Sequence, residues 1–312
     1  MNKDIKNLQQ LPGVGPGTEE KMKAGGVLNI LAVAVNTPGQ LKDAAGVTES
    51  AARKIINAAR DLCEIGFNTG KEIEDAELPR ISTYCKTMDA LLGGGLQLGT
   101  TMEAFGQFAT GKTNLSHIFA VSTLKMYPES YVVWVDTEGT FKPDRVRMIC
   151  EELGVDPEKA LAHILHGKAL TSDHQILLTE KVEELINNGD DVKLLIVDSL
   201  MNHFRAEYLG RGTLSVRQQM LNGYLHRIGK LVDIYKLAVY FTNQVQSDPG
   251  CMFGNPEKVV GGNIIGHFAE TRVWIIKAAK DTRRMKLVDS PNLPPGEANY
   301  RIVKGGFESV DN

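Results

Sequence analysis

The phosphate-loop pattern at residues 106–113 constrains the fold of this chain more than any other feature. These residues read GQFATGKT, which fits the pattern GxxxxGK[ST]. The apolar residues 102–105 before them are typical of a strand, and residues 114–125 after them are typical of a helix. A strand, a glycine-rich turn and a helix in this order can wrap a triphosphate with backbone N–H groups. The alternative, a glycine-rich turn that arose by chance, does not account for both flanking elements.

Residue types within this loop indicate what it binds. The Lys112 ammonium can reach the β- and γ-phosphates, and the Thr113 hydroxyl can bind Mg²⁺. The residues expected to contact the nucleotide are Gly106, Gln107, Phe108, Ala109, Thr110, Gly111, Lys112, Thr113 and Asn114. ATP and Mg²⁺ are therefore the predicted cofactors.

Apolar stretches that alternate with helical ones predict an α/β domain. Strands are expected at residues 102–105, 131–135, 194–197, 237–242, 272–276, 285–288 and 300–303. The first five runs show no polar alternation, which is typical of strands buried on both faces of a parallel sheet. A helix is expected over 172–188, ended by Gly189. The predicted fold class is α/β, a P-loop ATPase core with a parallel-rich central sheet.

Polar side chains follow three of these strands, at the edge where parallel sheets bind ligands. Asp198 ends one apolar strand, where a carboxylate can hold the Mg²⁺ shell. Glu138 follows another strand, and it either orients and polarises an attacking water or serves as a turn or helix-capping carboxylate. Gln244 follows a third strand, where a neutral amide can sense the γ-phosphate.

The first 65 residues predict a small helical domain in which one device occurs twice. The glycine turns LPGVGPG at 11–17 and AGVT at 45–48 are each followed by a helical stretch. Thr18 and Thr48 are the expected N-caps, because a threonine hydroxyl can accept from free backbone N–H groups. The expected apolar face of the helix at 49–62 consists of Ala51, Ile55, Ala58 and Leu62.

A change of composition after these helices predicts a linker. Residues 66–80 combine glycine, proline and charged residues without apolar periodicity, and they include one isolated aromatic residue, Phe67. The expected organisation is a helical domain at 1–65, a linker at 66–80 and the α/β core at 81–312.

Composition excludes several classes of protein. The chain has 312 residues, 42% hydrophobic and 23% charged, with a net charge of −3, as in ordinary soluble proteins. No apolar run approaches the roughly 20 residues of a membrane-spanning helix, and no signal peptide is expected at the N-terminus. A membrane partner is therefore not expected.

The cysteines and histidines do not form a metal site by spacing. The cysteines are Cys63, Cys85, Cys150 and Cys251. Their scattered positions predict free thiols in a reducing cytoplasm. Five histidines are expected on helices or at helix ends, and they are His117, His163, His166, His203 and His226. We interpret most of them as surface or core residues.

Further motifs run through nearly the whole chain in a fixed order. They are LPGVG at 11–15, LLGGGL at 91–96, DTEGTF at 136–141, FRAEYLGRG at 204–212, RQQ at 217–219, TNQV at 242–245, GGN at 261–263 and DSP at 289–291. With the phosphate loop, they resemble the RecA-type strand-exchange recombinases, and within them the archaeal RadA recombinases, which are close to the eukaryotic ones. The resemblance implies a RecA-like core with a helix–hairpin–helix domain. It also implies a cytoplasmic, nucleoid-associated DNA-dependent ATPase that forms a filament on single-stranded DNA and exchanges strands with a homologous duplex in recombinational repair.

The resemblance assigns roles around the nucleotide. The residues implied to hold MgATP and drive its hydrolysis are Lys112, Thr113, Asp198 and Glu138. Arg145 is implied to stack on the adenine. Gln244 is implied to couple the γ-phosphate to the DNA loop that follows it.

Subunit contacts are implied as well. Asp289, Ser290 and Pro291 resemble a cap over the ATP of a neighbouring subunit, with a monovalent cation such as K⁺ beside Asp289. Phe67 and Gly70 fit the family's Phe-x-x-small polymerisation motif, in which Phe67 inserts into a neighbouring core and extends its sheet edge. The alternative is that Phe67 packs on its own domain. Self-association into filaments or rings is therefore expected.

Contacts to single-stranded and double-stranded DNA are implied in three places. The implied residues are Arg205, Arg211, Arg217, Met252, Phe253, Lys258, Gly13 and Gly15. Arginines among glycines at 205–217 suit contacts to phosphates, and apolar residues at 246–262 can wedge between bases. The glycines of the first hairpin allow backbone N–H groups to approach a phosphate. By composition alone, both segments fit mobile surface loops and the hairpin fits a plain turn.

Some positions depart from the family, and other classes of protein remain open. The departures are Gln107, Ala109, Val259, Asn263, Ala278 and Ala279, and none removes a group that ATP hydrolysis requires. A regulatory paralogue that loads a recombinase would usually lack the hairpins, the polymerisation Phe or the second DNA loop. A small-molecule kinase would need a second phosphate-acceptor pocket. A helix–hairpin–helix nuclease or glycosylase would need a catalytic Lys or a metal cluster near the hairpins.

Overall fold

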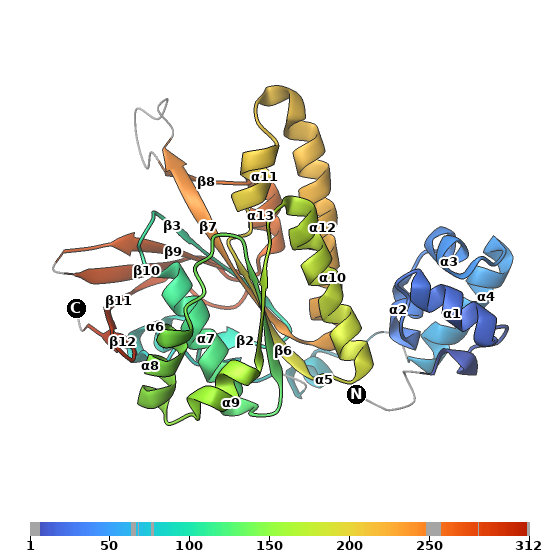
Figure 1. Ribbon diagram of the computed structural model, residues 1–312, viewed down its shortest axis with the longest axis horizontal. Helices are drawn as coiled ribbons and strands as arrows, with labels where there is room; N and C mark the ends of the chain where they lie inside the picture. The colour runs from blue at the N-terminus through green and yellow to red at the C-terminus, as the bar shows by residue number, and fades with distance from the viewer. Residues whose placement is uncertain are drawn as a thin grey trace. The chain divides into compact units, whose positions relative to one another are not determined.

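The structure, a computed structural model, describes residues 7–63, 67, 69–75, 78–247, 257–279 and 281–310 (Figure 1). The chain divides into two compact units. One consists of Met1–Glu77 with Asn187–Gly189, and the other of Leu78–Ile186 with Asp190–Asn312. The domain limits expected at residues 65 and 80 stay a prediction.

The first unit is helical. Its elements are the 3-10 helix η2 (Leu8–Gln10) and the helices α1 (Pro16–Ala24), α2 (Ile30–Val35), α3 (Pro38–Ala45), α4 (Glu49–Leu62) and α5 (Gly70–Asp75). The glycine turns lie between η2 and α1 and between α3 and α4, as predicted. Thr48 caps α4 by accepting from the Ala51 N–H (3.2 Å). The prediction for Thr18 is wrong, because Gly15 is the N-cap and Pro16 opens α1, as proline favours the first helical position.

The buried face of α4 differs from the predicted one. The helix buries Ala52, Ile55, Ile56 and Ala59. Of the predicted face only Ile55 is buried, and Leu62 at the helix end is half exposed. The predicted stripe and the observed stripe both fit the helical repeat, and packing against the rest of the helical unit determines which of them is buried.

The short helix α5 lies in the stretch expected to be a linker. Thr69 Oγ1 accepts from the Glu72 N–H (3.3 Å), and the Glu72 carboxylate accepts from the Thr69 N–H (2.7 Å). This reciprocal pair is a capping box. Apolar periodicity missed the helix because this pair of polar residues starts it.

A large sheet organises the second unit. Its strands are β3 (Thr101–Gly106), β4 (Tyr131–Asp136), β5 (Ile164–Lys168), β6 (Val192–Asp198), β7 (Ala238–Ser247), β8 (Glu257–Val259), β9 (Thr271–Lys277), β10 (Thr282–Asp289), β11 (Gly296–Val303) and β12 (Gly306–Ser309). The order is β12-β11-β10-β9-β3-β7-β6-β4-β5, with β8 paired to β7. Pairs from β9 to β5 are parallel, and those from β9 to β12 are antiparallel. A separate antiparallel pair consists of β1 (Arg80–Ile81) and β2 (Leu96–Gln97). The α/β prediction is confirmed.

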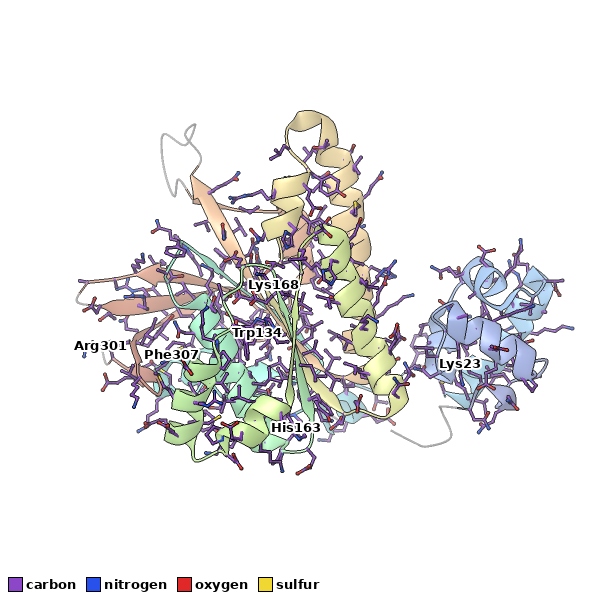
Figure 2. All side chains as sticks on the ribbon, viewed as in Figure 1. Lys23, Trp134, His163, Lys168, Arg301 and Phe307 are labelled. Atoms are coloured by element: carbon purple, nitrogen blue, oxygen red, sulfur yellow. The ribbon has the colours of Figure 1, made fainter. Side chains whose placement is uncertain are left out.

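Helices cover both faces of this sheet (Figure 1). They are α6 (Lys86–Leu91), α7 (Lys112–Met126), α8 (Pro143–Leu153), α9 (Pro157–Ala162), α10 (Ser172–Asn188), α11 (Asn202–Glu207), the 3-10 helix η3 (Arg211–Thr213), α12 (Leu214–Tyr235) and α13 (Asn263–Phe268). Successive side chains of β4 point to opposite faces of the sheet and pack into two separate hydrophobic cores. Trp134 packs with α7 and α8 on one face, and Val135 packs with α10 and α12 on the other. Figure 2 shows Trp134 inside the α/β unit. Among the described residues, no helix is long and apolar enough to cross a membrane.

The segments expected as DNA loops contain regular structure. Residues 205–217 lie mostly in α11, η3 and α12. In residues 246–262, β7 continues to Ser247 and pairs antiparallel with β8, so a β-hairpin forms the base of this segment. The prediction of irregular loops is therefore wrong for these helices and strands, while residues 208–210 and 260–262 lie in bends and turns.

Candidate functional site

The phosphate loop follows β3 and needs glycine at its two ends. Gly106 has φ +155°, and a Cβ there would lie 2.2 Å from the Ile275 carbonyl oxygen. Gly111 has φ +107° and caps α7 without help from any described side chain, so the first N–H groups of the helix face the loop. Ala109 takes a left-handed φ of +60°, which strains a residue with a Cβ. The exposed Phe108 lies between these positions.

Lys112 lies inside this loop. Its Nζ donates to the carbonyl oxygens of Gly106 (2.9 Å) and Gln107 (2.8 Å). Burial lowers the pKa of Lys112, and the carboxylates of Asp198 and Glu138 oppose this shift. The ammonium is thus held in the loop that would surround the phosphates.

Asp198 ends β6 next to the loop and is 2% exposed. The hydroxyl of Thr242 donates to its Oδ1, and that of Thr140 donates to its Oδ2 (3.2 Å). Burial raises the pKa of Asp198 to about 6, helped by the nearby carboxylates and opposed by the Thr242 and Thr113 hydroxyls. A buried carboxylate beside a threonine hydroxyl offers the hard oxygen ligands that Mg²⁺ prefers. In the described part of the chain no group of three His, Cys, Asp or Glu is placed to hold a metal ion.

Glu138 and Gln244 meet at the same edge. The Glu138 Oε1 accepts from the Ser199 hydroxyl (2.7 Å) and from the Gln244 Nε2 (2.9 Å). The three predicted strand ends therefore converge beside Lys112. The interpretation of Glu138 as a helix cap is not supported, because its side chain bonds to Ser199 after β6 and to Gln244 of β7. The prediction that Gln244 follows its strand is wrong, because β7 runs on to Ser247.

Arg145 lies on α8 and is anchored by the turn between β11 and β12. Its guanidinium donates to the carbonyl oxygens of Val303 (3.0 Å), Lys304 (2.5 Å) and Gly306 (3.4 Å). Stacking on adenine stays a prediction, and the structure shows what fixes the side chain.

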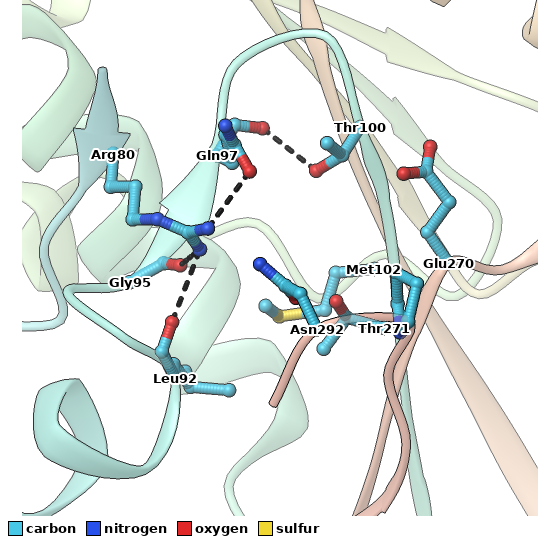
Figure 3. Close-up of a pocket in the computed structure, with 10 residues that line it drawn as sticks. Arg80, Leu92, Gly95, Gln97, Thr100, Met102, Glu270, Thr271 and Asn292 are labelled. Atoms are coloured by element: carbon cyan, nitrogen blue, oxygen red, sulfur yellow. Dashed lines mark hydrogen bonds between the residues drawn. The ribbon is translucent and has the colours of Figure 1, made fainter. Parts of the chain in front are cut away.

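Asp289, Ser290 and Pro291 lie away from the phosphate loop of their own chain. Asp289 ends β10 opposite Arg272 of β9. Pro291 lines a cavity of about 190 Å³ with residues from the amino ends of β3 and β9, and Figure 3 shows Arg80, Gln97 and Asn292 around it. The phosphate loop follows the opposite end of β3. A contact of this segment with ATP therefore requires a second subunit.

The predicted DNA contacts are only partly described. Met252 and Phe253 lie outside the described residues, and so do the side chains of Arg211 and Lys258. Arg205 on α11 is exposed and Arg217 on α12 is half-buried. At Gly13 and Gly15 the space beside the backbone is open, and Gly13 has φ +84°.

Phe67 is fully exposed. It does not pack on its own domain, so that alternative is wrong. Gly70 opens α5.

No role at the site was predicted from the sequence for two residues that lie near it. Asp136, 1% exposed, accepts hydrogen bonds from His166 and from the backbone of the Glu138 loop. His117, 2% exposed on α7, bonds to Thr113 and Lys142. The prediction for His166 is wrong, since it lies on strand β5. The sequence signal for Asp136 was an aspartate just before the turn Thr-Glu-Gly-Thr, where a carboxylate can bind successive backbone N–H groups.

Comparison with known proteins gives consistent matches. Residues 74–310 match the Rad51 family, and residues 5–61 match the SAM-like helix-hairpin-helix tandem. The DNA repair and recombination protein RadA of Methanococcus maripaludis strain C6 is 41% identical over 316 residues, which cover 96% of this chain and 98% of that protein. The protein of the same name from Methanococcus voltae is 39% identical over 97% of this chain and 99% of its own length. That from Aeropyrum pernix is 38% identical over 99% of this chain and 98% of its own.

Proposed function

This chain belongs to the Rad51 family, and from that premise we propose the roles of its residues in a DNA-dependent ATPase that forms filaments on single-stranded DNA and exchanges DNA strands in recombination. The observation that carries these roles is the convergence of Lys112, Asp198, Glu138 and Gln244 at one edge of the sheet. The three strand ends come from sequence positions far apart, so a chance arrangement does not explain them.

The phosphate loop binds and orients ATP. Its backbone N–H groups and the start of α7 face the phosphates. Lys112 leaves its two carbonyl partners for the β- and γ-phosphates. Asp198 and Thr113 would hold Mg²⁺, which would supply positive charge against the phosphates.

Glu138 positions the attacking water. Its Oε1 is engaged by Ser199 and Gln244, while its Oε2 has no hydrogen-bond partner among the described residues and can accept from a water. A carboxylate in this place orients the water and takes up its proton.

Gln244 links the nucleotide to the β7–β8 hairpin. Its carbonyl oxygen accepts from the Val260 N–H (3.1 Å), and Asn243 Nδ2 donates to the Val260 carbonyl (2.7 Å). When the Gln244 amide moves from Glu138 to a γ-phosphate, the base of the hairpin moves with it. Strand β8 of the hairpin carries Lys258, and the sequence between β7 and β8 includes Met252 and Phe253, which would contact DNA.

Filament contacts complete the site. Asp289, Ser290 and Pro291 would cap the ATP of a neighbouring subunit, with K⁺ beside Asp289. Within the described strands, β5 and β12 are the edges of the sheet, and the exposed Phe67 would anchor a strand added to one of them. The protein would act in the cytoplasm on nucleoid DNA.

Strand exchange between labelled oligonucleotides, with electron microscopy of the same samples, tests this function. We expect ATP-dependent filaments and exchange for the unaltered chain, and loss of both for Phe67→Ala with ATP binding retained. Exposed Ile73→Ala on α5 serves as the matched control. Filaments that persist in Phe67→Ala would refute the role of Phe67, and ATP binding with neither filaments nor exchange in the unaltered chain would refute the function.

A further inference from the structure

Two side chains account for every backbone N–H group in the loop that carries Glu138. We call residues 138–142 the Glu138 strap. Asp136 Oδ1 accepts from the N–H groups of Glu138 (3.0 Å), Gly139 (2.7 Å) and Thr140 (3.2 Å), and its Oδ2 accepts from Phe141 (3.1 Å). His117 Nε2 accepts from the Lys142 N–H (3.1 Å). Five successive donors therefore end on one carboxylate and one imidazole.

The hydrogen bonds of His117 define its tautomer. Because the Lys142 N–H is a donor, Nε2 must be unprotonated, so Nδ1 carries the hydrogen and donates to the Thr113 carbonyl oxygen (2.8 Å). Burial lowers the pKa of His117 to about 4, so the ring is neutral near pH 7. One imidazole thus joins the start of α7, which carries the metal-binding Thr113, to the end of the strap.

Aromatic packing holds the strap from the side. The His117 ring stacks on Phe141 with centroids 5.8 Å apart and contacts Trp134 at 4.7 Å. The His166 ring also stacks on Phe141, with centroids 4.9 Å apart, and its Nε2 forms a hydrogen bond with Asp136 (3.1 Å). The strap is therefore fixed by hydrogen bonds along its backbone and by ring contacts at Phe141.

We propose that His117 is a positioning residue which, together with Asp136, holds the Glu138 strap in register with the phosphate loop. This inference rests on the proposed role of Glu138. A carboxylate on an exposed turn accelerates hydrolysis only when its oxygen stays within hydrogen-bond reach of the attacking water. The Thr113–His117–Lys142 link makes the metal side and the water side of the site one rigid unit. His117 itself touches neither ATP nor water.

Substitution of His117 by Phe tests the link. His117→Phe keeps a ring against Phe141 and Trp134 and removes the acceptor for the Lys142 N–H. We expect kcat for ATP hydrolysis to fall roughly tenfold to a hundredfold, while the Kd for a non-hydrolysable ATP analogue changes less than about threefold, because the phosphate loop stays intact. His117→Gln restores an acceptor near the position of Nε2, and we expect most of kcat to return.

His163 provides a matched control. It is also a ring-stacked histidine, half-buried where His117 is buried, with Tyr131 at 4.9 Å and a hydrogen bond to the Ser130 carbonyl oxygen (3.0 Å). Figure 2 shows it at the opposite end of β5 from Lys168, whose strand position pairs with Asp136. His163→Phe should leave both kcat and Kd unchanged. A folded His117→Phe with kcat within about threefold of the unaltered chain would overturn the inference, as would equal losses of kcat and analogue affinity that Gln does not restore.

Glu138→Gln, measured beside these variants, separates the two claims. If Glu138→Gln is inactive and His117→Phe is active, only the positioning role fails. If Glu138→Gln remains active, the proposed role of Glu138 fails, and the purpose of the strap fails with it. Should His117→Phe not fold, hydrogen exchange in the unaltered chain decides. We expect slow exchange for the amides of 138–142, and exchange as fast as in an unstructured loop would overturn the inference.

Discussion

At the carboxyl edge of the sheet, Asp136 and Asp198 are almost fully buried and hydrogen-bonded, whereas Arg205 and Leu209, on the segment that follows β6, are exposed. Both regions begin at the same strand ends. The two regions differ in their side-chain contacts. At the nucleotide site the side chains already form hydrogen bonds with one another and with the backbone without a ligand. Of the side chains that we propose to contact DNA, Arg205 is exposed on the protein surface and Arg217 is half-buried. Chemistry therefore depends on preorganisation, and DNA affinity depends on charge presented at the surface.

The largest effect should come from the preorganised region. Glu138→Gln keeps the size of the side chain and its contact with Gln244, and it removes the carboxylate that takes up a proton. We expect the DNA-stimulated kcat to fall by roughly two to three orders of magnitude, with ATP still bound. Steady-state phosphate release measures this. Glu129→Gln, an exposed residue that pairs with Lys159 at the opposite end of β4 from Glu138, is the control, and an equal loss there would contradict the assignment.

The DNA-facing region should respond more weakly and with a different signature. Arg205→Ala removes one exposed charge, so single-stranded DNA should bind about tenfold more weakly, and the slope of log K against log salt should fall by about 0.7. Fluorescence anisotropy over a salt series measures both. Arg301→Ala on β11, also exposed, should change neither. An unchanged salt slope in Arg205→Ala would place the DNA contact elsewhere.

Burial of a neutral histidine predicts how stability depends on pH. His117 has a pKa of about 4 in the folded chain, set mainly by burial, with Arg145 and Lys142 lowering and Asp136 raising it. Between about pH 6.5 and 4 the unfolded chain binds a proton there that the folded chain does not, so stability falls as pH falls. We expect a loss of about 2 kcal/mol between pH 7.5 and pH 5 from this residue. Urea unfolding of the unaltered chain and His117→Phe, without nucleotide, measures it, and identical pH dependence in both would contradict the account.

The smallest effect should come from the phosphate loop itself. Ala109 has φ +60°, which glycine adopts without strain. Ala109→Gly should relieve about 1 kcal/mol of strain and lose a similar amount to the greater entropy of the unfolded chain. We therefore expect the melting temperature and ATP hydrolysis to stay nearly unchanged. A large loss of activity would show that the Ala109 methyl group has a role in binding.

The same comparison separates what the sequence could predict from what it could not. The strands and the polar residues at their ends, Asp198, Glu138 and Gln244, follow from local apolar runs. The bond of Asp136 to His166 and the bond of His117 to Lys142 did not, because they depend on the pairing of β4 with β5 and on the packing of α7 against α8. The predicted N-cap Thr18 and the predicted face of α4 failed for a related reason, since the local patterns fitted two registers. Residues 205–217 were predicted as a loop because their glycines and charged residues leave no apolar periodicity that would indicate the short helices found there.

The most direct test of the whole account is ATP hydrolysis measured with and without single-stranded DNA, in the unaltered chain and in Lys112→Ala. We predict a rate that rises several-fold with DNA and falls to background in the variant. ATP binding without any stimulation by DNA would contradict the link from the carboxyl edge of the sheet to the DNA-facing hairpin.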